Sequence, residues 1–205
     1  MFCGDEGHWE QIYTSKPEDQ LSWHQPMPTL SFDLIRQFAR PRSSVIDVGG
    51  GSSILAGMLV EEGFSPFTVL DISRTALEKS KNRLAPSLRS RIDWRVADIL
   101  SSPNLPAYDV WHDRAVFHFL VEPEQRVAYA ALVQRTVAPH GVLVLGTFDL
   151  DGPDKCSGLP VQRYDAKTLA SQFDENFSIL KETYEVHETP WGASQSFLYL
   201  VMQRR

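Results

Sequence analysis

The sequence predicts a doubly wound three-layer α/β fold in which about seven strands form one mostly parallel sheet. From about residue 43, short apolar runs rich in Val and Ile alternate with stretches of helical periodicity. The prolines are scattered through the connections rather than gathered in one linker. The last two extended segments have no helix between them, which predicts an antiparallel C-terminal hairpin on a parallel sheet.

The individual elements follow from this alternation. Short apolar runs predict five buried parallel strands, at residues 44–48, 67–71, 92–97, 109–112 and 142–148. Helical patterns occupy residues 29–39, 53–62, 75–84 and 124–138, and Asp165 is placed to cap one more helix. Residues 177–187 and 196–203 are the expected strands of the hairpin.

Length and composition exclude several classes of protein. The 205 residues suit one domain, and 42% hydrophobic with 22% charged residues is typical of a globular chain. No apolar run is long enough to span a membrane, and the N-terminal residues lack a secretory signal, so we expect a cytoplasmic protein. The two cysteines, Cys3 and Cys156, have no CxxC partner, and no metal site is expected.

Residues 1–28 differ from the rest of the chain, which we expect to form one domain over residues 29–205. This N-terminal segment carries Trp9, Tyr13 and Trp23 in a polar context without a clear period. We expect it to dock onto the domain as an aromatic lid, with a partly ordered tail as the alternative.

The first strand-to-helix turn carries the strongest functional signal. Asp47 lies near the end of a buried strand and is followed by the glycine turn Gly49, Gly50 and Gly51. Such a turn lets the backbone approach a ligand and presents the N–H groups of a helix N-terminus. Position 54 is Ile, which breaks the GxGxxG pattern of dinucleotide-binding proteins.

Two more acidic residues end the next two strands. Asp71 follows Gly51 by 20 residues, a spacing that suits hydrogen bonds to ribose hydroxyls in the crevice of such a sheet. Asp98 ends the third strand and is expected beside the base of the same nucleoside.

Together these residues resemble the class I S-adenosylmethionine (SAM)-dependent methyltransferases, a Rossmann-like family. The resemblance covers about residues 30–205. It implies that Asp47 and the glycine turn seat the methionine portion of SAM, that Asp71 and the adjoining Ile72 hold the ribose, and that Asp98 with Ile99 frames the adenine. The aromatic segment resembles the lid of a bacterial subgroup of uncertain substrate, which implies that Tyr13 and Trp23 contact the cofactor. S-adenosylhomocysteine (SAH) is the implied product.

Candidate catalytic residues follow the fourth strand. Asp113 and Arg114 are expected at its tip, where the family lines its active site, so Asp113 is a candidate for both catalysis and cofactor contact and Arg114 for acceptor contact. His112 and His118 are candidate general bases, which are needed only for a protonated amine or a hydroxyl acceptor. For either histidine, a structural role is the alternative.

The long connection after the fifth strand predicts an acceptor-binding loop. Residues 150–164 leave the carboxyl edge of the sheet, where this fold binds ligands. Within it, Arg163 is expected to hold an anionic group, Tyr164 to stack or donate a hydrogen bond, and Cys156 to line the pocket. The alternative is a packed surface loop with Arg163 paired to an acid.

The acceptor is predicted from two absences in the sequence. There is no Asn/Asp-Pro-Pro-Tyr/Phe motif, which argues against nucleic acid, and no large insertion that would dock a protein. A basic cluster at positions 79, 81, 83, 89, 91 and 95 is read as a solvated surface. We therefore expect methyl transfer to a small molecule. The alternatives are a protein lysine methyltransferase, a non-catalytic SAM sensor and an NAD-dependent oxidoreductase, and the oligomeric state is not predicted.

Overall fold

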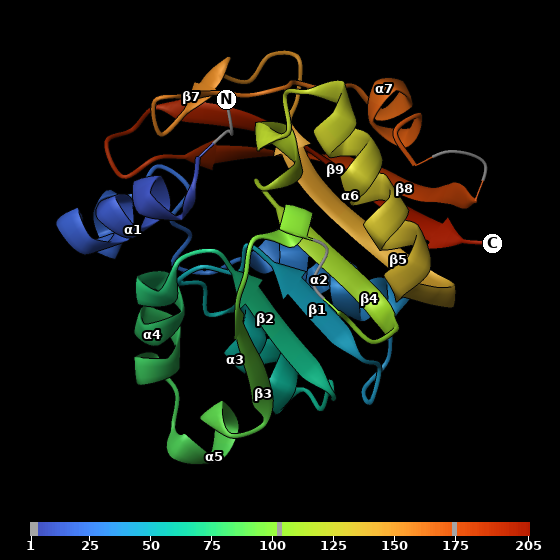
Figure 1. Cartoon of the computed structure of the whole chain (residues 1–205), viewed down its shortest axis with the longest axis horizontal. Helices are drawn as coiled ribbons and strands as arrows, with labels where there is room; N and C mark the ends of the chain where they lie inside the picture. The colour runs from blue at the N-terminus through green and yellow to red at the C-terminus, as the bar shows by residue number, and fades with distance from the viewer. Residues whose placement is uncertain (1–3, 102–103, 174–175) are drawn as a thin grey trace.

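A computed structural model describes residues 4–101, 104–173 and 176–205, so Cys3 lies outside the described residues. Seven strands form one sheet in the order β3-β2-β1-β4-β5-β9-β8 (Figure 1). β9 pairs antiparallel with both β5 and β8, and the other neighbours are parallel. This confirms the predicted α/β fold and its C-terminal hairpin.

The sheet strands lie close to their predicted positions. They are β1 (Val45–Val48), β2 (Phe67–Asp71), β3 (Ile92–Val96), β4 (Tyr108–Arg114), β5 (Val137–Phe148), β8 (Phe177–Glu188) and β9 (Ser194–Arg204). The helices are α1 (Glu6–Ser15), α2 (Thr29–Phe38), α3 (Leu55–Glu61), α4 (Arg74–Arg83), α5 (Pro86–Arg89), α6 (Pro123–Thr136) and α7 (Ala166–Ala170). Short 3₁₀ turns occupy η1 (Glu18–Gln20), η2 (Ile99–Ser101) and η3 (Phe117–Phe119).

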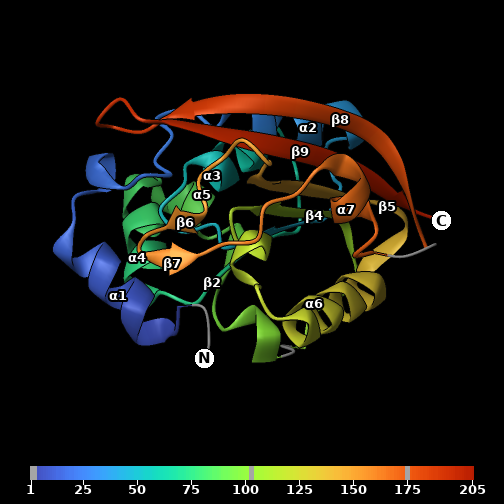
Figure 2. The same cartoon turned by 90° about the horizontal axis from the view of Figure 1, so that it is seen from above.

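The core lies on the two faces of this sheet. Successive strand residues alternate between faces, so Val45 and Val110 pack beneath α2 and α3, while Ile46 and Trp111 pack beneath α6. Figure 2 shows the sheet between these two helical layers. The same alternation puts Asp47 and His112, which are register partners on β1 and β4, on the face of α2.

Three local features differ from the prediction. Residues 6–15 form a regular helix, α1, which begins at the cap Asp5. The loop after β5 contains a small hairpin of β6 (Lys155–Cys156) and β7 (Leu159–Pro160). The helix expected to reach residue 138 ends at Thr136, because the chain enters β5 at Val137, which pairs with Tyr108.

The strand order changes direction between β1 and β4. The connection from β1 leads outward to β2 and β3, whereas β4 and β5 lie on the other side of β1. The carboxyl ends of β1 and β4 therefore border a crevice, the place where open α/β sheets bind ligands. Within the described chain, no helix is long and apolar enough to cross a membrane.

Candidate functional site

Two adjoining cavities lie at the carboxyl edge of the sheet. The larger cavity has a volume of about 450 Å³ and the smaller one about 190 Å³. Four residues line both of them: Tyr13, Trp23, Gly49 and Arg114. The glycine turn and the N-terminal segment therefore separate one continuous region into two compartments.

The glycine turn is packed so closely that side chains are excluded from it. Gly51 has a φ of +52°, and a Cβ on it would lie 2.6 Å from the hydroxyl of Tyr13. A Cβ on Gly50 would lie 2.7 Å from Oδ2 of Asp47. The absence of side chains here leaves the backbone of the turn as part of the wall of the smaller cavity.

The acidic strand tips meet at the larger cavity. Asp71, with the adjoining Ile72, and Asp98, with the adjoining Ile99, all line it. The Asp71 carboxylate accepts hydrogen bonds from the backbone N–H groups of Gly51 and Ser73, both at 2.8 Å. Burial nevertheless raises the pKa of Asp71 to about 7, and the nearby carboxylates of Asp47 and Glu10 act in the same direction.

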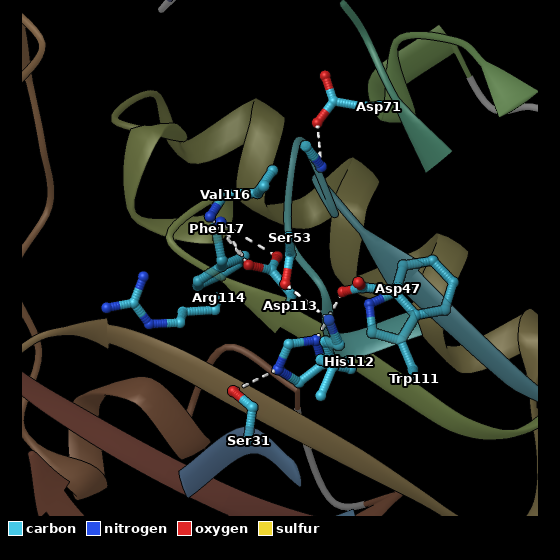
Figure 3. Close-up of polar contacts among 12 residues, drawn as sticks. Ser31, Asp47, Ser53, Asp71, Trp111, His112, Asp113, Arg114, Val116 and Phe117 are labelled. Atoms are coloured by element: carbon cyan, nitrogen blue, oxygen red, sulfur yellow. Dashed lines mark hydrogen bonds and ion pairs between the residues drawn. The ribbon is translucent and has the colours of Figure 1, made fainter. Parts of the chain in front are cut away.

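Asp47 lines the smaller cavity and is held there by His112. His112 Nδ1 lies 2.7 Å from Asp47 Oδ1, and its Nε2 lies 2.9 Å from Oγ of Ser31 on α2 (Figure 3). All three side chains are buried and line this cavity. The structure thus brings His112 into the site, beneath the glycine turn and outside the larger cavity.

Asp113 and Arg114, which are adjacent on β4, point to opposite faces. Asp113 is fully buried and accepts hydrogen bonds from the N–H groups of Val116 and Phe117 and from the hydroxyl of Tyr129. It therefore caps the turn after β4 and lines neither cavity among the described residues. Burial raises the pKa of Asp113 to about 6. The predicted catalytic and cofactor contacts of Asp113 find no support in this geometry.

Arg114 reaches both cavities and is fixed by its surroundings. Its Nε donates to the Tyr199 hydroxyl at 2.9 Å, and one terminal nitrogen donates to the Trp23 carbonyl at 3.2 Å. The guanidinium also lies over the ring of Phe197 at 4.4 Å. Arg114 thus lines both cavities, and its contact with an acceptor stays a prediction.

His118 lies outside both cavities. It is fully buried among Phe119, Phe148 and Phe197, and Nδ1 accepts from the Phe148 N–H at 3.4 Å. Burial lowers the pKa of His118 to about 3, so it is neutral at physiological pH. This geometry supports the structural alternative for His118 rather than the predicted catalytic role.

The N-terminal segment covers the cavities and is tied to α4. Tyr13 on α1 is buried and lies edge-on to Trp23, with ring centroids 5.9 Å apart. Lys79 donates to the Tyr13 carbonyl at 2.5 Å, and Arg83 forms an ion pair with Glu18. Two members of the basic cluster that was read as a solvated surface therefore anchor this segment.

The loop after β5 contributes only one of its three predicted residues. Cys156 is buried and lines the larger cavity. The exposed Arg163 donates to the carbonyls of Leu150 and Gly152, so its guanidinium braces the loop itself. Tyr164 is buried against Phe117 on the far side of the sheet. The described walls of the two cavities include neither residue, so this geometry gives no support to their predicted acceptor contacts.

Phe119, Ser31 and Tyr199 were not predicted as site residues. Phe119 packs edge to face at 5.1 Å against Trp9, which was expected in the lid, and both line the larger cavity. Ser31 and Tyr199 join the polar network around His112 and Arg114. Ser31 lies in an ordinary amphipathic helix and Tyr199 in an apolar strand, so neither has a local sequence signal.

Comparison with known proteins defines the class. Residues 46–143 match the family described as a methyltransferase domain, a range that runs from β1 into β5 and includes Asp47, Asp71 and Asp98. This match and the seven-stranded sheet with its antiparallel edge support a methyltransferase domain with the fold of SAM-dependent methyltransferases.

Individual relatives are distant. EEF1A lysine methyltransferase 2 from Danio rerio is 28% identical over 109 residues, which cover 50% of this chain and 47% of that protein. The chain thus spans about half the length of this curated relative. The N-methyltransferase NodS from Bradyrhizobium japonicum, solved with SAH, has a TM-score of 0.74 at 14% identity and covers 98% of this chain and 99% of its own. A structure from a study of thioacetal formation during echinomycin biosynthesis has a TM-score of 0.76 at 18% identity, covering 97% and 92%.

Proposed function

We propose that the protein transfers a methyl group from SAM to a small-molecule acceptor by direct in-line displacement. The observation that carries this proposal is the continuity of the two cavities. The glycine turn and Asp47 line the smaller cavity, and Asp71, Asp98 and the aromatic side chains of Trp9 and Phe119 line the larger one.

The residues present fit this cofactor. The turn is a cradle that a Cβ at Gly51 would fill, and Asp71 and Asp98 offer carboxylate oxygens at the place expected for ribose and adenine. Carboxylates and the ring faces of Trp9 and Trp23 favour a positively charged sulfonium. When bound, SAM supplies a methyl group that is already activated for transfer to a nucleophile.

The chain itself has to position the acceptor and exclude water. Tyr13 and Trp23 line both cavities, so a cofactor that spans them would lie against these two rings, which would shield it from solvent. Arg114 is oriented by Tyr199 and Phe197 and presents a cation to the acceptor. Alignment of this kind supplies roughly 7 to 11 kcal/mol of the barrier lowering.

The acceptor is a molecule that is nucleophilic before it binds. Among the described residues that line the larger cavity there is no histidine, burial raises the pKa of the Cys156 thiol, and the carboxylates of Asp71 and Asp98 are assigned to the cofactor. A general base is dispensable for a neutral amine or a thiolate. Because α1 and the hairpin β6/β7 cover the cavity, a small molecule fits this enclosure better than a folded protein.

A protein lysine is the second candidate acceptor. Its support is the name of the Danio rerio relative, an EEF1A lysine methyltransferase. A lysine side chain would have to pass the N-terminal segment to reach the cavity, so this candidate requires α1 to move.

Calorimetry with SAH and NAD tests the cofactor. We expect micromolar or tighter binding of SAH and none of NAD, and Asp71→Ala should weaken SAH binding by about 1.5 to 3 kcal/mol. Comparable NAD binding would contradict the proposal. A methyl-release assay over small amines, thiols and phenols, with a lysine-rich protein as the comparison arm, tests the acceptor. SAH binding without turnover of any acceptor would favour the non-catalytic sensor.

A further inference from the structure

A continuous chain of buried polar side chains joins the two cavities. It starts at Arg114, whose Nε donates to the Tyr199 hydroxyl, and the hydroxyls of Tyr199 and Ser31 lie 3.4 Å apart. From Ser31 it passes through His112 to Asp47. The three linking side chains are at most 3% exposed, and they come from β9, α2 and β4.

The charge of Asp47 sets the direction of the hydrogen bonds through His112 to Ser31. An ionised Asp47 can only accept, so Nδ1 of a neutral His112 must carry the ring proton. Nε2 then accepts from the Ser31 hydroxyl. Arg114 can only donate, so the Tyr199 hydroxyl accepts from it, and both Glu185 Oε2 and the Ser31 hydroxyl lie 3.4 Å from that hydroxyl. His112 thus donates to Asp47 and accepts from Ser31, so both of its ring nitrogens are bonded.

We propose that His112 is a positioning residue for Asp47. It holds the Asp47 carboxylate beneath the glycine turn, where Oδ2 lies 2.7 Å from the place that a Cβ on Gly50 would occupy. Ser31 fixes the ring of His112 from the other side. The inference rests on the proposed function, because the role of Asp47 beneath the turn is to receive the methionine portion of SAM.

This assignment differs from a general base. Nε2 of His112 is directed at Ser31 and not into the larger cavity, which is lined on this side by Arg114 instead (Figure 3). The charged and titratable groups around His112 are Asp47 on β1, Asp113 and Arg114 on its own strand, Tyr199 on β9 and Glu185 on β8, which lies 3.8 Å from Arg114 and 3.4 Å from the Tyr199 hydroxyl. Of these groups, Arg114 alone is among the described residues that line the larger cavity, and a guanidinium stays protonated.

Two substitutions separate positioning from packing. His112→Asn keeps an N–H near the place of Nδ1, so it should bind SAH within about threefold of the wild type. His112→Leu fills a similar volume without a donor, so its dissociation constant for SAH should rise by about tenfold or more, the loss of one charge-assisted hydrogen bond. The exposed His140→Asn serves as the matched histidine control, and thermal unfolding shows which variants are folded.

Nitrogen NMR of the His112 ring gives a readout that packing alone does not move. At pH 8 we expect a neutral ring with the proton on Nδ1, and Ser31→Ala should shift the Nε2 resonance toward that of an unbonded nitrogen. A ring protonated on Nε2, or equal SAH affinity in His112→Leu and wild type, would overturn the proposal. If the wild type itself did not bind SAH, the proposed function would fail instead. The tautomer of His112 would still show whether the hydrogen bonds to Asp47 and Ser31 form.

Discussion

Protonation of Asp71 should control how tightly the protein binds SAH. Its carboxylate is buried and lines the larger cavity, and the pKa is raised to about 7, mainly by burial, despite hydrogen bonds from Ser73 and Gly51. Only the ionised form can accept hydrogen bonds from two ribose hydroxyls while keeping those from the backbone. SAH binding should therefore strengthen as the pH rises through 7.

The magnitude follows from the ionised fraction. With a pKa of about 7, about one molecule in eleven has an ionised Asp71 at pH 6, and about ten in eleven at pH 8. If only the ionised form binds, the apparent dissociation constant should be about tenfold larger at pH 6 than at pH 8.

Calorimetric titration of SAH at pH 6, 7 and 8 measures this change. Repeating the pH 7 titration in buffers of different ionisation enthalpy counts the protons released, and we expect about half a proton per SAH bound at pH 7. Asp71→Asn cannot titrate at this position, so it should show neither the change in affinity with pH nor the proton release. The values measured with this variant also give the contribution of any titration of SAH itself. A wild-type affinity that is constant from pH 6 to 8, with no proton release, would refute the reasoning.

Three further predictions concern the walls of the site. Gly51→Ala should weaken SAH binding by about tenfold or more, because its Cβ would meet the Tyr13 hydroxyl. Gly158→Ala is the control, because Gly158 also has a positive φ, +80°, but has open space around it, so this variant carries the backbone strain without a steric clash. Equal SAH binding by both variants would contradict the steric argument. Lys79→Ala should speed hydrogen exchange in residues 5–28, since Lys79 bonds the carbonyls of Tyr13 and Lys16, whereas Lys81→Ala on the same helix should not. Arg163→Ala should lower the free energy of unfolding by about 1 kcal/mol and leave SAH affinity unchanged, because the guanidinium bonds only loop carbonyls; weaker SAH binding would restore Arg163 to the site.

The sheet was predictable because its signals are local. The hydrophobic period and the residue composition predict β1 to β5, and the absence of a crossover helix between the last two extended segments predicts the hairpin of β8 and β9. The boundary at Thr136 was placed two residues late, because pairing of Val137 with Tyr108 outweighs the helical pattern. Helix α1 was not predicted as a helix, since its stability comes from docking against α4 rather than from an apolar stripe.

The cofactor side of the site was more predictable than the acceptor side. Asp47, Asp71 and Asp98 each follow a recognisable strand, so their places at one edge follow from the topology. Which way a side chain points depends on strand phase, and this separates His112 and Arg114, which reach the cavities, from Asp113, which caps a turn. Arg163 is in the expected loop, but its partners are carbonyls that only the folded loop assembles.

The position of Tyr13 has a consequence for the rate at which ligands exchange. Tyr13 lines both cavities. Its helix, α1, is held to α4 by two hydrogen bonds: the Glu10 carboxylate accepts from the Thr75 N–H, and Lys79 donates to the Tyr13 carbonyl. A ligand that spans the two cavities cannot leave until these hydrogen bonds between α1 and α4 break. We expect departure of the spent cofactor, not the chemical step, to limit turnover, so that loosening α4 from α1 raises the maximal rate while it weakens retention of SAH.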